Sequence, residues 1–211
     1  MYKLKVPYYE GITVNETELK NFFEQLPIHI IDQLPWNAYP YKPHTTFKIA
    51  YNDEAILLNY EVLEKNIRIN SFQSNDPIWE DSCVEFFISF QEGFYYNLEF
   101  NALGIALVGY GSTQKSSRKY LPDTIIEKIK SFSSIETKMD EEGVRWNLSL
   151  HIPLDVFFQE KIQSFRGIRC GANFYKCGDL LPSPHFLSWS PIKSTEPNFH
   201  LPEFFGIIEF E

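Results

Sequence analysis

The sequence predicts an all-β fold: an antiparallel β-sandwich with jelly-roll or immunoglobulin-like layering and a few short helices. Short runs of alternating apolar and polar residues recur along the chain, with turn residues between them, as is typical of sandwiches. Aromatic residues make up 17% of the chain, and large flat side chains favour strands. Because no long helical segments separate the runs, a doubly wound parallel sheet is not expected.

The individual elements follow from local signals. Leucine and phenylalanine at helical spacing predict a helix over residues 16–26, which Pro27 ends. Alternation predicts strands over 45–51, 55–63, 83–90, 94–101, 104–110, 143–151, 167–176 and 205–210. A short helix is expected over 122–132, because Pro122 suits a helix start, and a helical turn over 153–158.

The size and charge of the chain limit its organisation and its partners. Hydrophobic residues form 44% of the 211 residues, enough to bury a substantial core. We therefore expect one domain over residues 1–211, with residues 1–40 as an N-terminal extension packed on it. The formal net charge is −9 and no Lys/Arg run occurs, so neither a nucleic-acid nor a membrane partner is expected.

The cysteines and the N-terminus bear on the compartment. The three cysteines are Cys83, Cys170 and Cys177, an odd number without a C-x-x-C pair. This pattern suggests neither a disulfide framework nor a zinc cluster, and reduced thiols favour a reducing compartment. The N-terminal MYKLKVPYYEG contains no apolar signal-peptide core. We expect a cytoplasmic protein; a secreted or periplasmic location would require a signal that had been removed.

The hairpin CVEFFISF–QEG–FYYNLEFN carries the functional argument. Alternation sends Val84 and its i+2 neighbours to the core and Glu85 to the opposite face. If a three-residue turn is centred on Glu92, Glu85 lies directly opposite Glu99, with Cβ atoms about 4.5–5.5 Å apart, where like charges are destabilising. A cationic side chain, a bound cation, a shared proton or a polyhydroxylated ligand would offset the repulsion. Alternatively, both carboxylates are solvated on an open face.

Neighbouring positions add groups that suit a sugar. Arg169 is expected to neutralise the glutamate pair, and Asn173 to bond to ligand hydroxyls. Trp79 and Trp189 fall at strand edges, where rings would stack on the C–H faces of a sugar, whereas strand parity places Trp146 in the core. The expected ligand-binding residues are Trp79, Glu85, Asn97, Glu99, Asn101, Arg169, Asn173, Tyr175 and Trp189.

Several stretches resemble the family-9 carbohydrate-binding modules, in the bacterial stand-alone branch of the DOMON-like sandwiches. They are WEDSCVEFFISF (79–90), YYNLEFNALG (95–104), RWNLSLHIP (145–153), GIRCGANFYKCGD (167–179), FLSWSPI (186–192) and FHLPEFFGIIEF (199–210). The resemblance implies a sandwich that holds the end of an oligo- or polysaccharide between two tryptophans. Trp79 and Trp189 would take those places, with Glu85 as the acidic sugar contact.

The same resemblance bears on cofactors and on associated proteins. Family members are often modules appended to xylanases or other glycosidases, whereas we expect this chain to stand alone. No cofactor is implied as a requirement, but relatives contain structural calcium. Asp76, Glu80 and Asp81 are the candidate oxygen ligands here, although their spacing is not that of an EF-hand.

A glycoside hydrolase is the principal alternative to a binding module. Two carboxylates about 5–5.5 Å apart suit a retaining glycosidase, with one of Glu85 and Glu99 as nucleophile and the other as acid. An open sheet face, however, would do little to desolvate either group and raise its pKa. We therefore expect non-catalytic carbohydrate binding.

Two further alternatives remain. A haem-binding sandwich would need Met and His ligands, but Met139 lies in a charged stretch, and His151 and His185 have no obvious partner. A protein–protein scaffold could use an aromatic rim, but it would not need Glu85 opposite Glu99.

Overall fold

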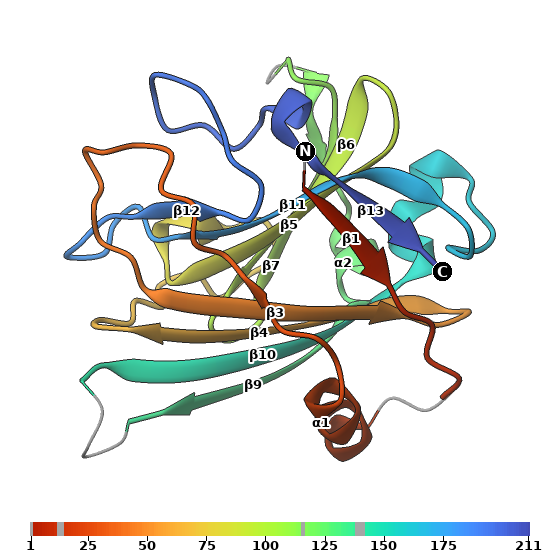
Figure 1. Cartoon of the computed structure of the whole chain (residues 1–211), viewed down its shortest axis with the longest axis horizontal. Coiled ribbons are helices and arrows are strands. Elements are labelled where there is room, and N and C mark those ends of the chain that lie inside the picture. The colour runs from red at the N-terminus through yellow and green to blue at the C-terminus, as the bar shows by residue number, and fades with distance from the viewer. Residues whose placement is uncertain (1, 12–14, 115–116, 138–141) are drawn as a thin grey trace.

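The computed structural model describes residues 2–11, 15–114, 117–137 and 142–211. Within these residues, two β-sheets lie face to face over a shared apolar core, which confirms the predicted sandwich (Figure 1). In order across the first sheet, the strands are β1 (Lys3–Val6), β13 (Gly206–Phe210), β11 (Arg169–Cys177), β5 (Cys83–Gln91), β6 (Phe94–Asn101), β7 (Ala106–Gly111) and β8 (Lys119–Tyr120), with β12 (Phe186–Ser188) beside β11. In order across the second sheet, they are β2 (His29–Ile30), β3 (His44–Tyr51), β4 (Ala55–Glu64), β10 (Val144–Pro153) and β9 (Lys130–Glu136).

The helices are short. Among the described residues, α-helix occurs in α1 (Glu16–Glu24) and α2 (Asp123–Ile126), and 3₁₀ turns occupy Ile78–Glu80, Leu154–Glu160 and Pro202–Phe204. Asn15 caps α1 by accepting a hydrogen bond from the backbone of Glu18, as N-cap residues do. In the described part of the chain, no helix has the length and apolar character needed to span a membrane.

The structure differs from the sequence prediction in one expected helix, in the direction of one strand pair, and in five strands that were not predicted, namely β1, β2, β8, β9 and β12. Residues 122–132 do not form one helix, because α2 ends at Ile126 and β9 begins at Lys130. Strand β9 pairs along its whole length with β10, so long-range hydrogen bonding overrides a weak local helix preference. In addition, β1 pairs with β13 in parallel, so the first sheet is mixed rather than purely antiparallel.

The core lies between the sheets and is largely aromatic. Phe174 of β11 stacks on Phe47 of β3 with ring centroids 3.8 Å apart and on Phe86 of β5 at 5.0 Å. Val84 and Trp146 also lie in this core, as their strand parity predicted. The aromatic contact between β3 and β11 joins one sheet to the other and fixes their relative position.

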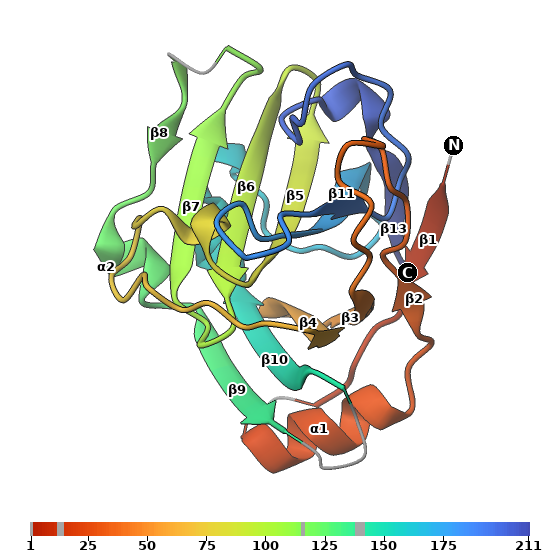
Figure 2. The same ribbon diagram turned by 90° about the vertical axis from the view of Figure 1, so that its left-hand side faces the viewer.

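A second apolar layer covers the outer face of the first sheet. It comprises Trp36, Ile78, Cys83, Phe87, Tyr95, Leu107, Tyr175, Cys177, Ile192, Phe199 and Phe205. The rings of Trp36 and Phe199 lie 5.9 Å apart, and they belong to two loops that lie side by side at one end of the sheet (Figures 1 and 2). Loops therefore cover most of the outer face of the first sheet, the face that carries Glu85 and Glu99.

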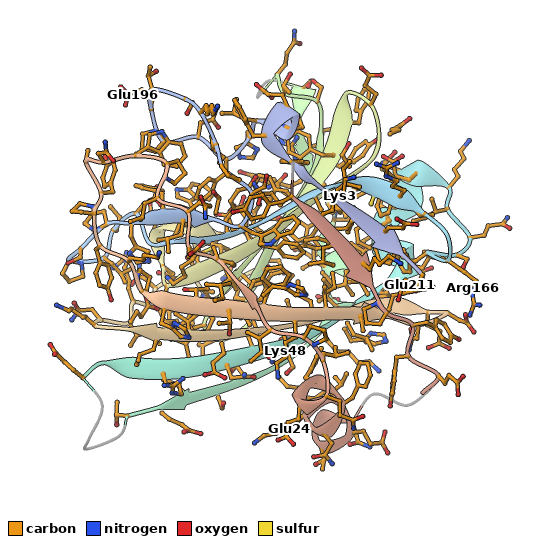
Figure 3. The ribbon with its side chains drawn as sticks, in the orientation of Figure 1. Lys3, Glu24, Lys48, Arg166, Glu196 and Glu211 are labelled. Carbon is orange, nitrogen blue, oxygen red and sulfur yellow. The ribbon has the colours of Figure 1, made fainter. Side chains whose placement is uncertain are left out.

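Helix α1 covers the outer face of the second sheet instead. Leu19 and Phe23 pack on small and apolar side chains of β3 and β4. Lys48 of β3 reaches the end of the helix, where its Nζ donates a 2.7 Å hydrogen bond to the carbonyl of Phe23 (Figure 3). The helix thus lies on the opposite side of the molecule from the loops that cover the first sheet.

Candidate functional site

A pocket of about 460 Å³ opens between the first sheet and the loops that cover it. Strands β5, β6 and β7 supply its floor, and the loops supply aromatic and polar walls. The lining residues are Trp79, Glu85, Asn97, Glu99, Leu107, Arg118, Tyr120, Cys177, Asp179, Phe186, Pro197, Asn198, Phe199 and His200. Volumes of roughly 300–1,000 Å³ are usual for small-molecule sites, so the pocket is large enough for a ligand.

The two glutamates on the floor are directly paired. Glu85 lies opposite Glu99 in the β5–β6 register, as predicted. The predicted three-residue turn is wrong, because the register shifts by one between Ile88 and Gln91, which pairs with Phe94. A bulge before a tight turn absorbs the extra residue, and Gly93 accepts the left-handed backbone (φ 85°) that the turn requires.

Both carboxylates are buried, so the alternative of an open, solvated face is wrong. Glu85 is 3% exposed and Glu99 is 4% exposed. Burial, together with the nearby Cys177 and Glu99, raises the pKa of Glu85 well above its usual range. Burial also raises the pKa of Glu99 to about 7, although the hydrogen bond from Asn97 and the charge of Arg118 act in the opposite direction. The protonated form of Glu85 reduces the repulsion between the two groups.

An arginine that the sequence analysis missed completes the floor. Arg118 donates a hydrogen bond to Asn97 Oδ1, and Asn97 Nδ2 donates to Glu99 Oε1 at 2.9 Å. The guanidinium lies 4.0 Å from the ring centroid of Tyr95 and donates to the backbone carbonyls of Gly111, the last residue of β7, and Ser112. Gly109 faces Asn97 across β6–β7, and a methyl group there would lie 2.5 Å from Asn97 Oδ1. Arg118 stands outside any alternating run, so periodicity gave no signal for it.

Comparison with known proteins agrees with this architecture. A candidate carbohydrate-binding protein from Bacteroides uniformis, known from its crystal structure, has 36% sequence identity and a TM-score of 0.92, with 99% of each chain covered. The model of carbohydrate-binding family 9 matches residues 17–210.

The chain belongs to carbohydrate-binding family 9. Two structures of a family-9 module from Caldicellulosiruptor kristjanssonii share its fold. The complex with glucose has a TM-score of 0.64 and 14% identity over 100% of this chain and 96% of the module. The complex with cellotriose has a TM-score of 0.66 and 15% identity over 100% and 94%. Among curated proteins, none matches this sequence.

Of the two tryptophans that the family resemblance implied, the structure brings one to the pocket. Trp79 lines it, directly before β5. Trp189 is only 6% exposed and lies in the inter-sheet core, where its ring meets Phe47 at 6.2 Å and Phe174 at 5.6 Å. Tyr120, which is 57% exposed, lies with Phe186 and Phe199 among the other rings that line the pocket of this family-9 chain.

Arg169 does not lie beside the glutamate pair. It is exposed at the start of β11, and in the strand register it lies opposite Glu209 of β13. Tyr175, not Arg169, is the residue of β11 that pairs with Glu85. Six residues separate the two positions, or about 20 Å at roughly 3.3 Å per residue. Arg118, which directly precedes β8, occupies the place expected for Arg169, because its guanidinium reaches Asn97 and the ring of Tyr95.

Three other predicted site residues shape the pocket without lining it. Asn173 is fully buried, and its side chain accepts from the backbone N–H of Ser190 at 2.8 Å and donates to the carbonyl at 3.1 Å. Tyr175 stacks on Phe199 with centroids 4.2 Å apart. Asn101 donates to Asp81 and to a backbone carbonyl. These residues hold the covering loops in place, because their polar atoms bond to protein.

The three carboxylates considered for calcium do not converge. Asp76 accepts hydrogen bonds from two backbone N–H groups of the 72–73 turn, and Asp81 accepts from those of Asn70 and Ser71. Arg68 lies 3.5 Å from Asp81 and 4.0 Å from Glu80. Within the described chain, the only three acidic, cysteine or histidine donors that gather within 4.8 Å are Cys83, Glu85 and Cys177.

Of the residues considered for haem, His185 lies in a polar environment of its own. Met139 and Met1 lie outside the described residues. His185 is fully buried beside Lys176, with Nε2 2.9 Å from the ammonium, and beside Glu64 at 3.8 Å. This imidazole therefore belongs to a buried charge cluster between the sheets.

Proposed function

We propose that this family-9 chain binds carbohydrate without chemical turnover and that the sugar occupies the pocket above Glu85 and Glu99. The supporting observation is the polar floor that these glutamates form with Asn97 and Arg118 below a wall of aromatic rings. Fixed acceptors and donors of this kind match the hydroxyl groups around a pyranose ring.

The walls of the pocket supply the second component of sugar recognition. Trp79, Tyr120 and Phe186 present ring surfaces from three different segments of the chain. The C–H faces of a pyranose stack on such rings, which also exclude water from the polar contacts. A sugar held on both its polar edge and its apolar face would be fixed in one orientation.

Glucose and cellotriose are the first ligands to test, because the family-9 module of Caldicellulosiruptor kristjanssonii binds them. A pocket of about 460 Å³ with loops on several sides suits a monosaccharide or the end of a chain better than the middle of a polymer. The proposed binding requires no cofactor.

One observation favours the alternative of a glycoside hydrolase. Burial raises the pKa of both Glu85 and Glu99, which supplies the desolvation that a catalytic acid needs. Binding remains the proposed function because the family is defined by carbohydrate binding. Product analysis with each sugar distinguishes the two functions.

Calorimetric titration of glucose and cellotriose tests the proposal. Wild-type protein should bind saturably, and Glu99→Gln and Trp79→Ala should each weaken binding at least roughly tenfold, a loss of about 1.4 kcal/mol. Glu92→Gln and Phe94→Ala are matched controls at the exposed turn of the same hairpin and should bind as wild type does.

Two results would contradict the proposed function. If neither sugar nor a wider glycan panel binds to the wild-type protein, the pocket is not a carbohydrate site. If cellotriose is cleaved by the wild-type protein and not by Glu99→Gln or Glu85→Gln, the protein is a glycosidase and the carboxylate pair is catalytic.

A further inference from the structure

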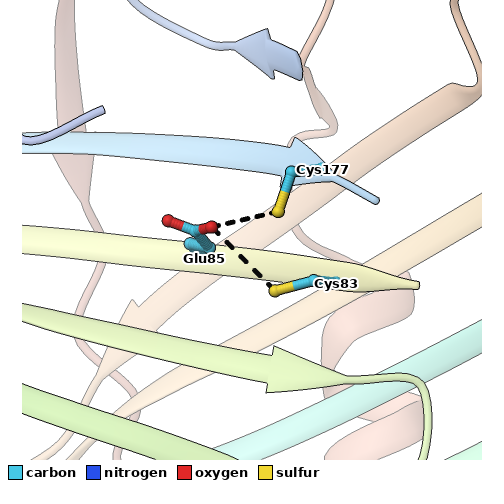
Figure 4. Close-up of side chains that lie close together, drawn as sticks. All are labelled: Cys83, Glu85 and Cys177. Atoms are coloured by element: carbon cyan, nitrogen blue, oxygen red, sulfur yellow. Dashed lines mark hydrogen bonds between the residues drawn. The ribbon is translucent and has the colours of Figure 1, made fainter. Parts of the chain in front are cut away.

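Two thiols and a carboxylate meet at the edge of the pocket. Cys83 of β5 and Cys177 of β11 are directly paired across adjacent strands. Glu85 lies two residues after Cys83 and therefore on the same face of the sheet. Its Oε1 lies 3.1 Å from Cys177 Sγ and 4.0 Å from Cys83 Sγ, and all three donor atoms lie within 4.8 Å of one another (Figure 4).

These separations fit a common metal ion. With Zn–S bonds of about 2.3 Å and a Zn–O bond of about 2.1 Å, a tetrahedral centre separates its sulfur and oxygen ligands by about 3.6 Å. The two observed sulfur–oxygen distances, 3.1 and 4.0 Å, lie on either side of this value. Shifts of a few tenths of an ångström in the side chains of Cys83 and Cys177 would equalise them.

We propose that Cys83, Cys177 and Glu85 bind a thiophilic divalent cation, and that Zn²⁺ is the ion that fits this donor set. Two sulfur donors and one carboxylate oxygen suit a borderline-soft ion, whereas calcium and magnesium prefer oxygen alone. This site differs in donors and position from the acidic residues considered for calcium.

The pocket gives the ion an entry path and a fourth coordination position. Glu85 and Cys177 line the pocket, while Cys83 lies behind them and is fully buried. Three protein ligands leave one tetrahedral position open, and a water molecule from the pocket would occupy it.

A metal ion that binds here has to displace the protons of two buried thiols. Burial raises the pKa of Cys83 to about 12, and it raises the pKa of Cys177 as well, so both thiols keep their protons when no metal is bound. The buried ammonium of Lys176 acts in the opposite direction on both groups. Metal binding would release both thiol protons, and the thiolates formed would lie near this fixed cation.

Cobalt substitution tests the site directly. Co²⁺ added to the reduced protein without oxygen should produce a thiolate-to-cobalt charge-transfer band and the visible bands of a tetrahedral centre, and Zn²⁺ should abolish both. Cys83→Ala and Cys177→Ala should each lose the charge-transfer band. Cys170→Ala is the matched control, because Cys170 is also a buried cysteine but lies in the inter-sheet core. Absence of the band in wild-type protein, or its persistence in both variants, would overturn the proposal.

A second measurement does not depend on the folding of the variants. X-ray absorption of the Zn²⁺-loaded wild-type protein should show sulfur neighbours at about 2.3 Å. A first shell of nitrogen and oxygen alone would refute the site. Because both experiments use the metal without sugar, their outcome is separate from that of the glucose and cellotriose titrations.

Discussion

Arg118 donates its guanidinium hydrogen bond to Asn97, and through that amide it is linked to the buried carboxylate of Glu99. A loop residue and two strand residues therefore act as one polar unit at the floor of the pocket. The unit is preorganised, because Tyr95 lies under the guanidinium and the backbone carbonyls of Gly111 and Ser112 accept hydrogen bonds from its Nη1.

Replacing Arg118 should weaken sugar binding selectively. A hydrogen bond to a charged group contributes about 1.5–3 kcal/mol, so Arg118→Met should weaken binding of glucose roughly 10- to 100-fold. Arg169→Met is the control, since this exposed arginine lies far along β11 from the pocket. Calorimetry of both variants decides which arginine serves the site; equal losses would contradict the assignment to Arg118.

The two tryptophans at strand edges should respond differently to truncation. Trp79→Ala should reduce affinity for sugar and lower the free energy of unfolding less than Trp189→Ala does, because the half-buried ring lines the pocket and packs only on the edge of the second apolar layer. Trp189→Ala should lower the free energy of unfolding by about 3–5 kcal/mol, since it removes a buried ring from the core. Urea unfolding and calorimetry measure the two effects. If Trp189→Ala abolished binding in a stably folded protein, Trp189 would belong to the site.

Lys176 and Glu64 form a fully buried ion pair with a 3.0 Å separation. Glu64 also accepts a 2.6 Å hydrogen bond from the indole of Trp146. Lys176→Met should lower the free energy of unfolding by about 3–5 kcal/mol, because it leaves the Glu64 charge buried without its partner. The double variant Lys176→Met with Glu64→Gln should recover part of this loss. Denaturant unfolding of the single and double variants measures the coupling, and strictly additive effects would show that the pair does not interact.

His185 should make stability fall in mild acid. Burial and the ammonium of Lys176 lower its pKa to about 3, against the partial effect of the Ser183 carbonyl; the unfolded value is about 6.5. Because the folded pKa is depressed, the imidazole is neutral in the folded protein. The contribution of the neutral imidazole to the free energy of unfolding is fully present above about pH 6.5. It is lost as the pH falls toward about 3, at up to about 1.4 kcal/mol per pH unit.

Urea unfolding between about pH 6.5 and about pH 4, for wild type and His185→Gln, measures how much His185 contributes to the pH dependence of stability. The groups around the imidazole are Lys176 from β11, Glu64 from β4 and the ring of Tyr41. The variant should show a shallower decline between about pH 6.5 and about pH 4. Identical slopes in the two proteins would mean that His185 does not titrate on unfolding.

The sequence predicted the sandwich and the pairing of Glu85 with Glu99, because side-chain alternation is a local property of a strand. The hairpin needs only its own residues to set its register. The bulge before Gly93 escaped prediction, because a bulge followed by a two-residue turn gives Glu85 and Glu99 the same register as the expected three-residue turn. The helix expected over 122–132 failed for a related reason: β9 owes its conformation to β10, which is distant in sequence.

The sequence by itself determined which side chains share a strand face, whereas the tertiary structure decided what covers that face. Alternation placed Glu85 and Cys83 together, but it could not show that loops bury them or that Arg118 reaches them. It also gave no sign of the pairing between Cys83 and Cys177, which are 94 residues apart and fit no metal-binding spacing. Periodicity records only contacts within a segment; burial, pKa shifts and donor clusters depend on segments that meet only in the folded chain.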